Sequence, residues 1–375
     1  MKTINAQCAF QAMWLCLLFL LLGVCLSSAA EIDEKIAQCA NLQDDDAARL
    51  KCFDELAGKS TAAPAAAVRS AATTNSSQET VAGEKNISVM TQHWDMDLIP
   101  HKQKKFFVLW PYRPNYFLPV AYNSSPNDEV GLQFNSGAQA QHNEVKFQLS
   151  FKFKIWEDIF RGELQKTIAE STGIRGVDIW IAYTQQSFWQ LYNAAFSSPF
   201  RDTNYEPELL FNFRLQRDIP GLRGAKLQFV NLGFNHESNG RSEPLSRSWN
   251  RLVANIGLEK GSFGLQLKTW YRIPEDEEKD DNADLSRYLG YGELWGTYYW
   301  NRHRFGAMVR NNLRGSHNLG AVQLDWSMPL SMIWSELGDK FSFYIQYFNG
   351  YGESLLDYNQ STNRISAGFM LADWN

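Results

Sequence analysis

The feature that most constrains the fold is a strict alternation of apolar and polar side chains over residues 145–155. Every odd position, from Val145 to Ile155, is apolar, and every even position, from Lys146 to Lys154, is Lys, Gln or Ser. Because successive side chains of a β-strand point to opposite faces, the run predicts a strand with one apolar and one polar face. Its length matches the ~9–11 residues of a tilted membrane-crossing strand, and a strand of a soluble sandwich is the alternative.

Similar alternating runs recur along the rest of the chain. We expect twelve strands, an even number that is typical of bacterial outer-membrane barrels. They lie near residues 105–122, 145–156, 178–190, 207–216, 225–236, 248–259, 262–273, 288–301, 303–313, 317–328, 340–349 and 363–373. Aromatic residues make up 14% of the chain, which suits the aromatic girdles of such a barrel. The sequence therefore predicts an all-β fold: a twelve-stranded antiparallel transmembrane β-barrel, with a short N-terminal helical extension clamped by a disulfide.

Residues 1–30 are predicted to be a secretory signal peptide. The long apolar run within Ala12–Ala30 follows Lys2 and ends in the small residues Ser28-Ala29-Ala30. An uncleaved membrane anchor is the alternative. After residue 30 no run approaches the ~20 apolar residues of a spanning helix, so an exported chain of this kind is either soluble or a barrel.

Residues 31–58 are predicted to form a small helical module in the periplasm. Cys39 and Cys52 lie in it, and in an oxidising compartment a disulfide between them is favoured over metal or redox chemistry. Residues 59–90 form a predicted linker rich in Ala, Ser and Thr. The barrel domain is expected over 91–375. With the module in the periplasm, the loops expected at the outer rim are 123–144, 191–206, 237–247, 274–287, 314–316 and 350–362.

One of these rim loops, within residues 235–251, holds the densest cluster of reactive side chains. On the strand before it, His236 and Ser238 continue the face that carries Val230, Leu232 and Phe234. On the strand after it, Asn250 continues the face that carries Leu252, Ala254, Ile256 and Leu258. A barrel wall turns its apolar face toward lipid, so His236, Ser238 and Asn250 are expected to project outward, near the headgroups.

A His, a hydroxyl and an amide on one face are sufficient for acyl transfer. We predict Ser238 as the nucleophile and His236 as the general base. Asn250 is predicted to accept a hydrogen bond from the far imidazole nitrogen and to fix its tautomer. The backbone N–H of Gly240 is the predicted oxyanion donor. A site on the lipid side of the wall would meet phospholipid esters. A solvated polar loop, with Gly240 as a simple turn residue, is the alternative.

The same loop offers oxygen atoms to a metal ion. Ser242, Ser246, Ser248 and the loop carbonyls are hard ligands, so one interpretation is a calcium ion that polarises the ester carbonyl, and the other is a solvated Ser-rich loop. The acidic run Glu275–Asp284 lies in the next rim loop. For this run the sequence is compatible with a calcium site and equally with a solvated surface loop.

The chain resembles the outer-membrane phospholipase A family of Gram-negative bacteria. The resemblance is densest over Asn235–Arg251, is supported by Asn143–Ser150, Ser197–Glu208 and Gly350–Tyr358, and covers roughly residues 105–375. It implies a twelve-stranded barrel in the outer membrane. It also implies His236 as base, Ser238 as nucleophile and Asn250 as orienting amide, and hydrolysis of acyl esters at either glycerol position and of lysophospholipids.

The resemblance further implies a calcium ion and a second subunit. The ion would be held by the Ser246 side chain and the Arg241 carbonyl, with the Ser197 carbonyl coming from the other subunit. Activation by formation of a homodimer is implied, with Gln185 as a polar residue of the interface.

Three functions are compatible with these observations. The leading hypothesis is a calcium-dependent outer-membrane phospholipase. The alternative is a non-enzymatic outer-membrane channel or adhesin, in which Lys146, Lys152, Lys154, Arg304 and Arg310 could line a pore. A soluble secreted esterase is the third. The net charge of −5 is modest, so no nucleic acid partner is expected.

Overall fold

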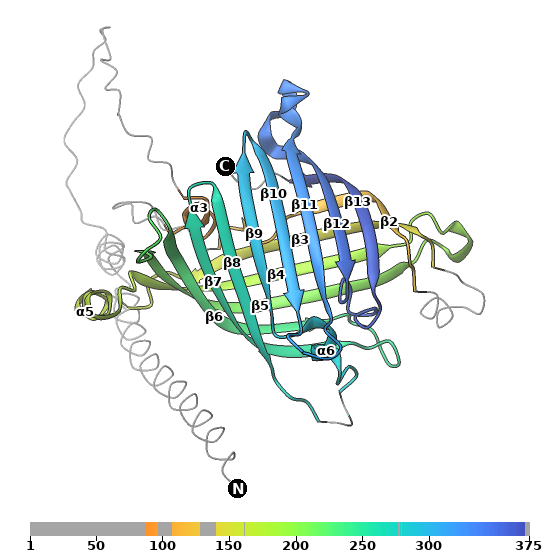
Figure 1. Cartoon of the computed structure of the whole chain (residues 1–375), viewed down its shortest axis with the longest axis horizontal. Helices are drawn as coiled ribbons and strands as arrows, with labels where there is room; N and C mark the ends of the chain where they lie inside the picture. Colours follow the sequence, from red (N-terminus) through yellow and green to blue (C-terminus); the bar gives the residue numbers. More distant parts are fainter. Residues whose placement is uncertain are drawn as a thin grey trace, which may run out of the picture. The chain divides into compact units, whose positions relative to one another are not determined.

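Twelve antiparallel strands close into a barrel in the computed structural model (Figure 1). The structure describes residues 88–96, 107–127, 140–160, 162–276, 278 and 280–371. All of them belong to one compact unit, Val81–Asn375. The predicted signal peptide, the module with the Cys39–Cys52 disulfide and the linker up to residue 87 lie outside the described residues.

The strands follow one another around the wall in chain order. They are β2 (Tyr116–Asn123), β3 (Asn143–Trp156), β4 (Gly176–Trp189), β5 (Phe200–Asp218), β6 (Lys226–Ser238), β7 (Ser248–Lys260), β8 (Phe263–Arg272), β9 (Gly292–Trp300), β10 (His303–Asn311), β11 (Gly320–Pro329), β12 (Phe341–Gly350) and β13 (Thr362–Leu371). Each pairs with its neighbours in the chain, and pairing of β13 with β2 closes the ring. The prediction of an all-β, twelve-stranded antiparallel barrel is confirmed.

Two predicted strands differ most from the structure in their bounds, and the other strand ends agree or are shifted by one to four residues. The run 105–122 is not one strand: the two-residue β1 (Trp110–Pro111) and β2 are separated, and both pair with β3. Pro111 and Pro114 lack the N–H that a continuous ladder needs. Conversely, β5 begins at Phe200 rather than near 207. Its first residues are polar and resemble a loop, but Asp202 and Glu206 are buried inside the barrel.

The wall is apolar outside and mostly polar inside. On β3, Leu149 is 51% exposed, whereas Lys146 and Lys152 are 0% exposed. The alternation that predicted this strand is therefore inverted relative to a soluble protein, since the polar face is the buried one. The outward apolar face suits contact with lipid.

Most of the cations that could have lined a pore are paired inside the barrel. Lys146 Nζ lies 2.9 Å from Glu353, Lys154 Nζ lies 3.3 Å from Asp178, and Arg304 pairs with Asp325. Arg310 donates to the carbonyls of Tyr351 and Gly352 at 2.7 and 2.8 Å. Such cross-links occupy part of the lumen and tie these cations to other parts of the barrel.

The fifth of these cations, Lys152, lies among aromatic rings. Its Nζ is 3.5 Å from the ring centroid of Trp94 and about 5.5 Å from those of Tyr112 and Trp180. Trp94 is the C-cap of the short helix α3 (Val89–His93), and it is 2% exposed. The helix thus ends with an aromatic ring buried in the barrel core.

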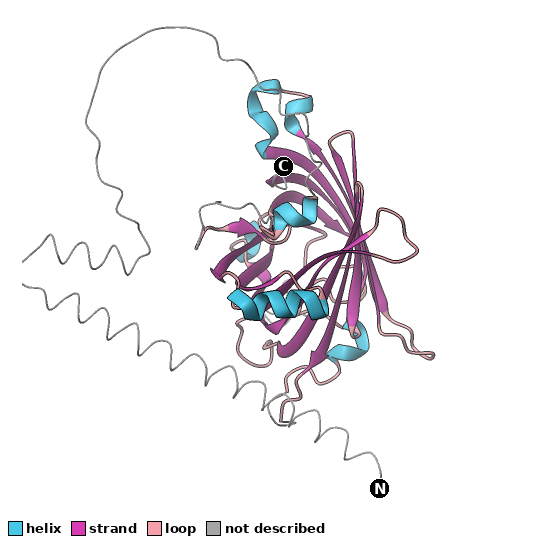
Figure 2. Cartoon of the chain, turned by 90° about the vertical axis from the view of Figure 1, so that its left-hand side faces the viewer, coloured by secondary structure: helices cyan, strands magenta, loops and turns pink. Residues whose placement is uncertain are grey.

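Short helices lie at the ends of the strands (Figure 2). Helix α3 is held at the β7–β8 end, because Ser88 Oγ and Met90 N both donate to Glu259, at 2.7 and 3.1 Å. Helix α5 (Gly162–Thr172) joins β3 to β4, and α6 (Leu285–Leu289) precedes β9 at the opposite end from α3 (Figure 1). In the described residues no helix is both long and apolar enough to span a membrane.

Candidate functional site

His236 and Asn250 face each other across the β6–β7 hairpin, on its outer face. They are direct register partners, and His236 Nδ1 lies 2.9 Å from Asn250 Oδ1. Their neighbours on this face are apolar and exposed to the outside, with Phe234 41% exposed. The structure thus agrees with the prediction, made from the alternation of the two strands, that both side chains point outward.

Ser238 is the last residue of β6 and lies on the same face as His236, two residues further on. It pairs with Ser248 on β7 and with Tyr205 on β5. Among the described residues, no hydrogen bond joins its hydroxyl to the imidazole. Contacts of this kind are often loose before substrate binds.

Asn239 organises the loop that follows, a role that the sequence analysis missed. It is 4% exposed, and its Oδ1 accepts hydrogen bonds from the backbone N–H groups of Arg241 and Arg247 at 3.3 and 3.0 Å. Its Nδ2 donates to the Leu245 carbonyl at 2.8 Å. The available signal was an Asn directly after a strand, since this side chain readily bonds the backbone two residues on.

Gly240 adopts a backbone conformation that favours glycine. Its φ is +64°, and an added Cβ would lie 3.1 Å from the Tyr205 ring. Immediately after Ser238 and Asn239, the chain therefore uses the positive φ that glycine allows.

The residues considered for calcium lie on the same rim. Arg241 donates from its guanidinium to the carbonyls of Phe200 and Arg201, both at 2.9 Å, which ties its loop to the segment that follows Ser197. Ser197 is exposed, with φ +59°. Ser246 is half-buried. No group of three His, Cys, Asp or Glu side chains suited to a metal occurs among the described residues. Ser197, Arg241 and Ser246 offer hydroxyl and carbonyl oxygen atoms, which are among the ligands that calcium accepts.

The acidic run Glu275–Asp284 folds back against the start of β7, and several of its carboxylates already have protein partners. Glu275 Oε1 accepts from Asn250 Nδ2 at 3.2 Å, and Asp280 lies 2.6 Å from Arg272. Asp284 accepts from the Tyr358 hydroxyl, and burial together with this hydrogen bond raises the pKa of Tyr358. The contact between Glu275 and Asn250 was not predicted, because the alternation of side chains along a strand does not predict the conformation of a loop.

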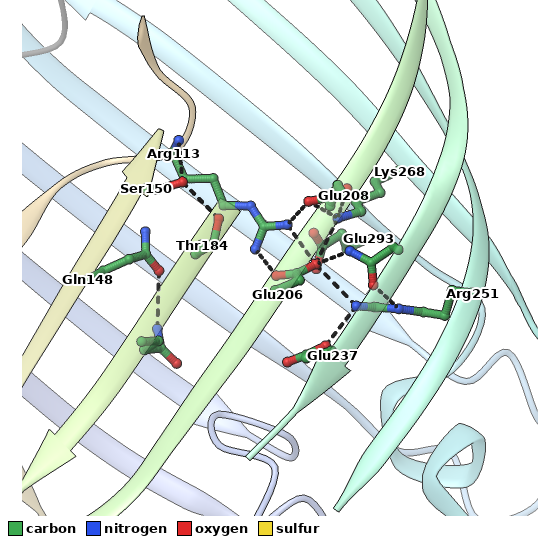
Figure 3. Close-up of polar contacts among 12 residues, drawn as sticks. Arg113, Gln148, Ser150, Thr184, Glu206, Glu208, Glu237, Arg251, Lys268 and Glu293 are labelled. Atoms are coloured by element: carbon green, nitrogen blue, oxygen red, sulfur yellow. Dashed lines mark hydrogen bonds and ion pairs between the residues drawn. The ribbon is translucent and has the colours of Figure 1, made fainter. Parts of the chain in front are cut away.

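Behind the site, the inner face of the same hairpin carries a charged network (Figure 3). Asn235 and Arg251 are register partners, next to the His236–Asn250 pair along the two strands. Arg251 Nε donates to Asn235 Oδ1 at 2.8 Å. Arg251 also lies 3.1 Å from Glu206 and 2.7 Å from Glu237. The network continues through Arg113, Glu208 and Lys268.

A cavity of about 530 Å³ lies inside the barrel. Glu237 and Arg251 line it, whereas His236, Ser238 and Asn250 do not. The wall formed by β6 and β7 therefore separates the cavity from the candidate site.

Gln185 lies on the outer face of β4 with Tyr183 and Ser187. Its Oε1 accepts from the Tyr183 hydroxyl at 3.1 Å, and its Nε2 donates to Ser187 Oγ at 3.3 Å. Both ends of the amide are thus bonded within β4, and the role of Gln185 in an interface stays a prediction.

Comparison with known proteins finds the same fold and sequence family. A family model described as phospholipase A1 matches residues 90–371. A relative from Neisseria meningitidis is 37% identical over 272 residues, which cover 70% of this chain and 65%, just under two thirds, of the relative. The solved outer membrane phospholipase A from Escherichia coli is 34% identical, with a TM-score of 0.62 over 73% of this chain and 96% of that one. A Salmonella typhi outer membrane phospholipase, solved as a dimer with bound calcium, matches with the same identity, TM-score and coverage.

Proposed function

This chain belongs to the phospholipase A1 family, and from that premise we propose that it is an outer-membrane enzyme that hydrolyses the acyl esters of glycerophospholipids and lysophospholipids. The observation that carries the proposal is the His236–Asn250 pair, bonded at 2.9 Å on the outside of the barrel. A base held on the apolar face of the wall, at the end of its strands, meets lipid esters at headgroup level without extracting them.

The proposed reaction is acyl transfer to Ser238. His236 takes the hydroxyl proton at Nε2 as Ser238 Oγ attacks the ester carbonyl, and it returns this proton to the leaving alcohol. Asn250 keeps Nδ1 protonated, so that Nε2 is free to act as the base. The Gly240 N–H stabilises the oxyanion that forms on the carbonyl oxygen. Water then hydrolyses the acyl-enzyme with the same base.

We also propose that the enzyme depends on calcium and acts as a homodimer. Ser246 would hold the ion with its hydroxyl and Arg241 with its carbonyl, and the Ser197 carbonyl of a second subunit would complete the set. When bound, calcium would polarise the ester carbonyl. The neutral oxygen donors at this rim and the Salmonella typhi relative, a dimer with calcium, support this. Gln185 would pair with its counterpart across the interface.

The channel or adhesin has less support. Its pore-lining cations are paired or packed against rings in the lumen, and the polar His, Ser and Asn side chains on the outer face would have no function in it. In the localisation we propose, the barrel lies in the outer membrane and residues 31–58 lie in the periplasm.

Substitution of the nucleophile tests the proposal. We expect Ser238→Ala to reduce fatty-acid release from phospholipid in mixed micelles by about 10³-fold or more, with the barrel still folded by its heat-dependent gel mobility. Ser262→Ala, an exposed serine in the turn between β7 and β8, is the control and should retain activity. Chelation of calcium should abolish release by the wild-type protein, and normal release by Ser238→Ala would exclude the mechanism.

A further inference from the structure

The Asn250 side chain is bonded at both ends of its amide. Its Oδ1 faces His236 Nδ1 at 2.9 Å, and its Nδ2 donates to Glu275 Oε1 at 3.2 Å. Glu275 is half-buried and lies in the loop after β8, 25 residues further along the chain. His236, Asn250 and Glu275 therefore form a continuous hydrogen-bond chain across β6, β7 and the loop after β8.

The Glu275 carboxylate decides which way the amide points. An ionised carboxylate only accepts hydrogen bonds, so the amide must turn its NH₂ group toward Glu275. The amide oxygen is then left facing the imidazole, where it can only accept. His236 must consequently carry its proton on Nδ1, and Nε2 is left as the base on the side of Ser238. With no acceptor behind it, the amide could flip and present its NH₂ group to Nδ1, which would stabilise the opposite tautomer.

The loop is built to keep Glu275 at this position. The Ile273 N–H donates to the Asn250 carbonyl at 2.8 Å, two residues before Glu275. Further along, the Ser248 N–H donates to Asn282 Oδ1 at 3.0 Å, and Asn282 is 2% exposed. Arg272 closes the loop through Asp280 at 2.6 Å. Both ends of the acidic segment are thus anchored to β7, the strand that carries Asn250.

We propose that Glu275 is a positioning residue, which orients the Asn250 amide and through it sets the His236 tautomer. This inference rests on the proposed function, in which His236 is the base. It also gives the neutral amide a negative charge behind it, which supports the imidazolium that forms as Ser238 loses its proton. Glu275 thus compensates for the weaker support that Asn gives compared with Asp.

Two variants of the full-length chain in detergent test the role of Glu275 in activity. We expect Glu275→Ala to lower kcat about tenfold with little change in KM, since the amide contacts the base and not the lipid. Glu275→Gln should lose less, because its side-chain oxygen can still accept from Asn250. Glu278→Gln is the matched control: it is an exposed carboxylate of the same loop, and its activity should stay at the wild-type level.

The decisive measurement is the tautomer itself. In protein labelled with ¹⁵N-histidine, with the His236 signal assigned by its loss in His236→Ala, the wild type should show the Nδ1–H form. Glu275→Ala should show a substantial Nε2–H population, and Glu278→Gln none. An unchanged tautomer in Glu275→Ala overturns the proposal whatever happens to kcat, because a lower kcat alone would then reflect the loop and not the amide.

The Ser238→Ala variant tests the proposed function independently of the role of Glu275. If Ser238→Ala keeps its activity, the serine mechanism fails even where the tautomer shifts as expected. If Ser238→Ala is inactive while Glu275→Ala keeps both the wild-type tautomer and kcat, the mechanism stands and the role of Glu275 is excluded.

Discussion

The two faces of the β6–β7 hairpin solve different problems at neighbouring positions. On the inner face, Arg251 contacts Asn235, Glu206 and Glu237 and stacks 3.8 Å from the centroid of the Trp249 ring. On the outer face, the adjacent His236–Asn250 pair belongs to a single line of hydrogen bonds that ends at Glu275. On the inner face, Arg251 has several polar partners. On the outer face, a single hydrogen bond joins each side chain to the next.

The difference follows from what each face must do. Charges buried in a lumen lose their hydration, so each needs protein partners, and the resulting cross-links fix the wall. A reacting group must keep one side free for substrate, so it can have only as many partners as its orientation requires. We infer that the inner face supplies stability and the outer face supplies activity.

Removal of a charge from the inner face should give the largest change in stability. Arg251→Met keeps the bulk beside Trp249 but leaves Glu237 without its 2.7 Å ion pair. We expect the free energy of unfolding in guanidinium to fall by about 3 kcal/mol. The activity of the molecules that remain folded should fall much less.

Two further variants sharpen this result. In Arg251→Met combined with Glu237→Gln both partners are neutral, so much of the lost stability should return. Asn250→Ala, one position away on the outer face, should lower kcat and change stability by less than about 0.5 kcal/mol. If Asn250→Ala unfolds the barrel as readily as Arg251→Met, the division between the faces is wrong.

A smaller effect on stability should appear with acid, through Glu353. This carboxylate lies in the loop between β12 and β13, 2.9 Å from Lys146 and 2.8 Å from Arg364. Burial alone would raise its pKa, but the Arg364 and Lys146 charges lower the pKa of Glu353 below its usual value of 4.5. A lowered pKa contributes stability above the unfolded value, which is lost as the pH falls through the folded one.

We therefore expect the barrel to lose stability below about pH 4.5, where Glu353 is among the groups that take up a proton. Unfolding measured at pH 7 and at pH 3.5 should show a smaller difference in Glu353→Gln than in the wild type. An equal difference in the two proteins would mean that Glu353 contributes nothing to the acid response.

The sequence predicted the repeating part of the molecule better than the loops. Alternation in β3 and in the β6–β7 pair predicts which face is apolar, because period two survives any small error in the strand ends. That sufficed to bring His236 opposite Asn250. Alternation did not predict the start of β5, because its first residues are polar and resemble a loop. In the structure these polar residues face a polar lumen. Asn239 and Glu275 act through loop geometry, for which no periodic signal exists.

The smallest expected effect on stability lies at Gly240, two residues after Ser238. Substitution there tests whether the outer face tolerates backbone strain. Gly240 has φ +64°, so Gly240→Ala should cost about 1 kcal/mol and push a methyl group toward the Tyr205 ring. Because the N–H of this residue is the proposed oxyanion donor, kcat should fall several-fold although the fold is kept. Gly240→Asn is the matched variant, since Asn adopts positive φ more readily than Ala. If conformation is the cause, Asn should restore part of the stability that Ala loses, whereas equal stability losses in the two variants would assign the effect to contact with Tyr205.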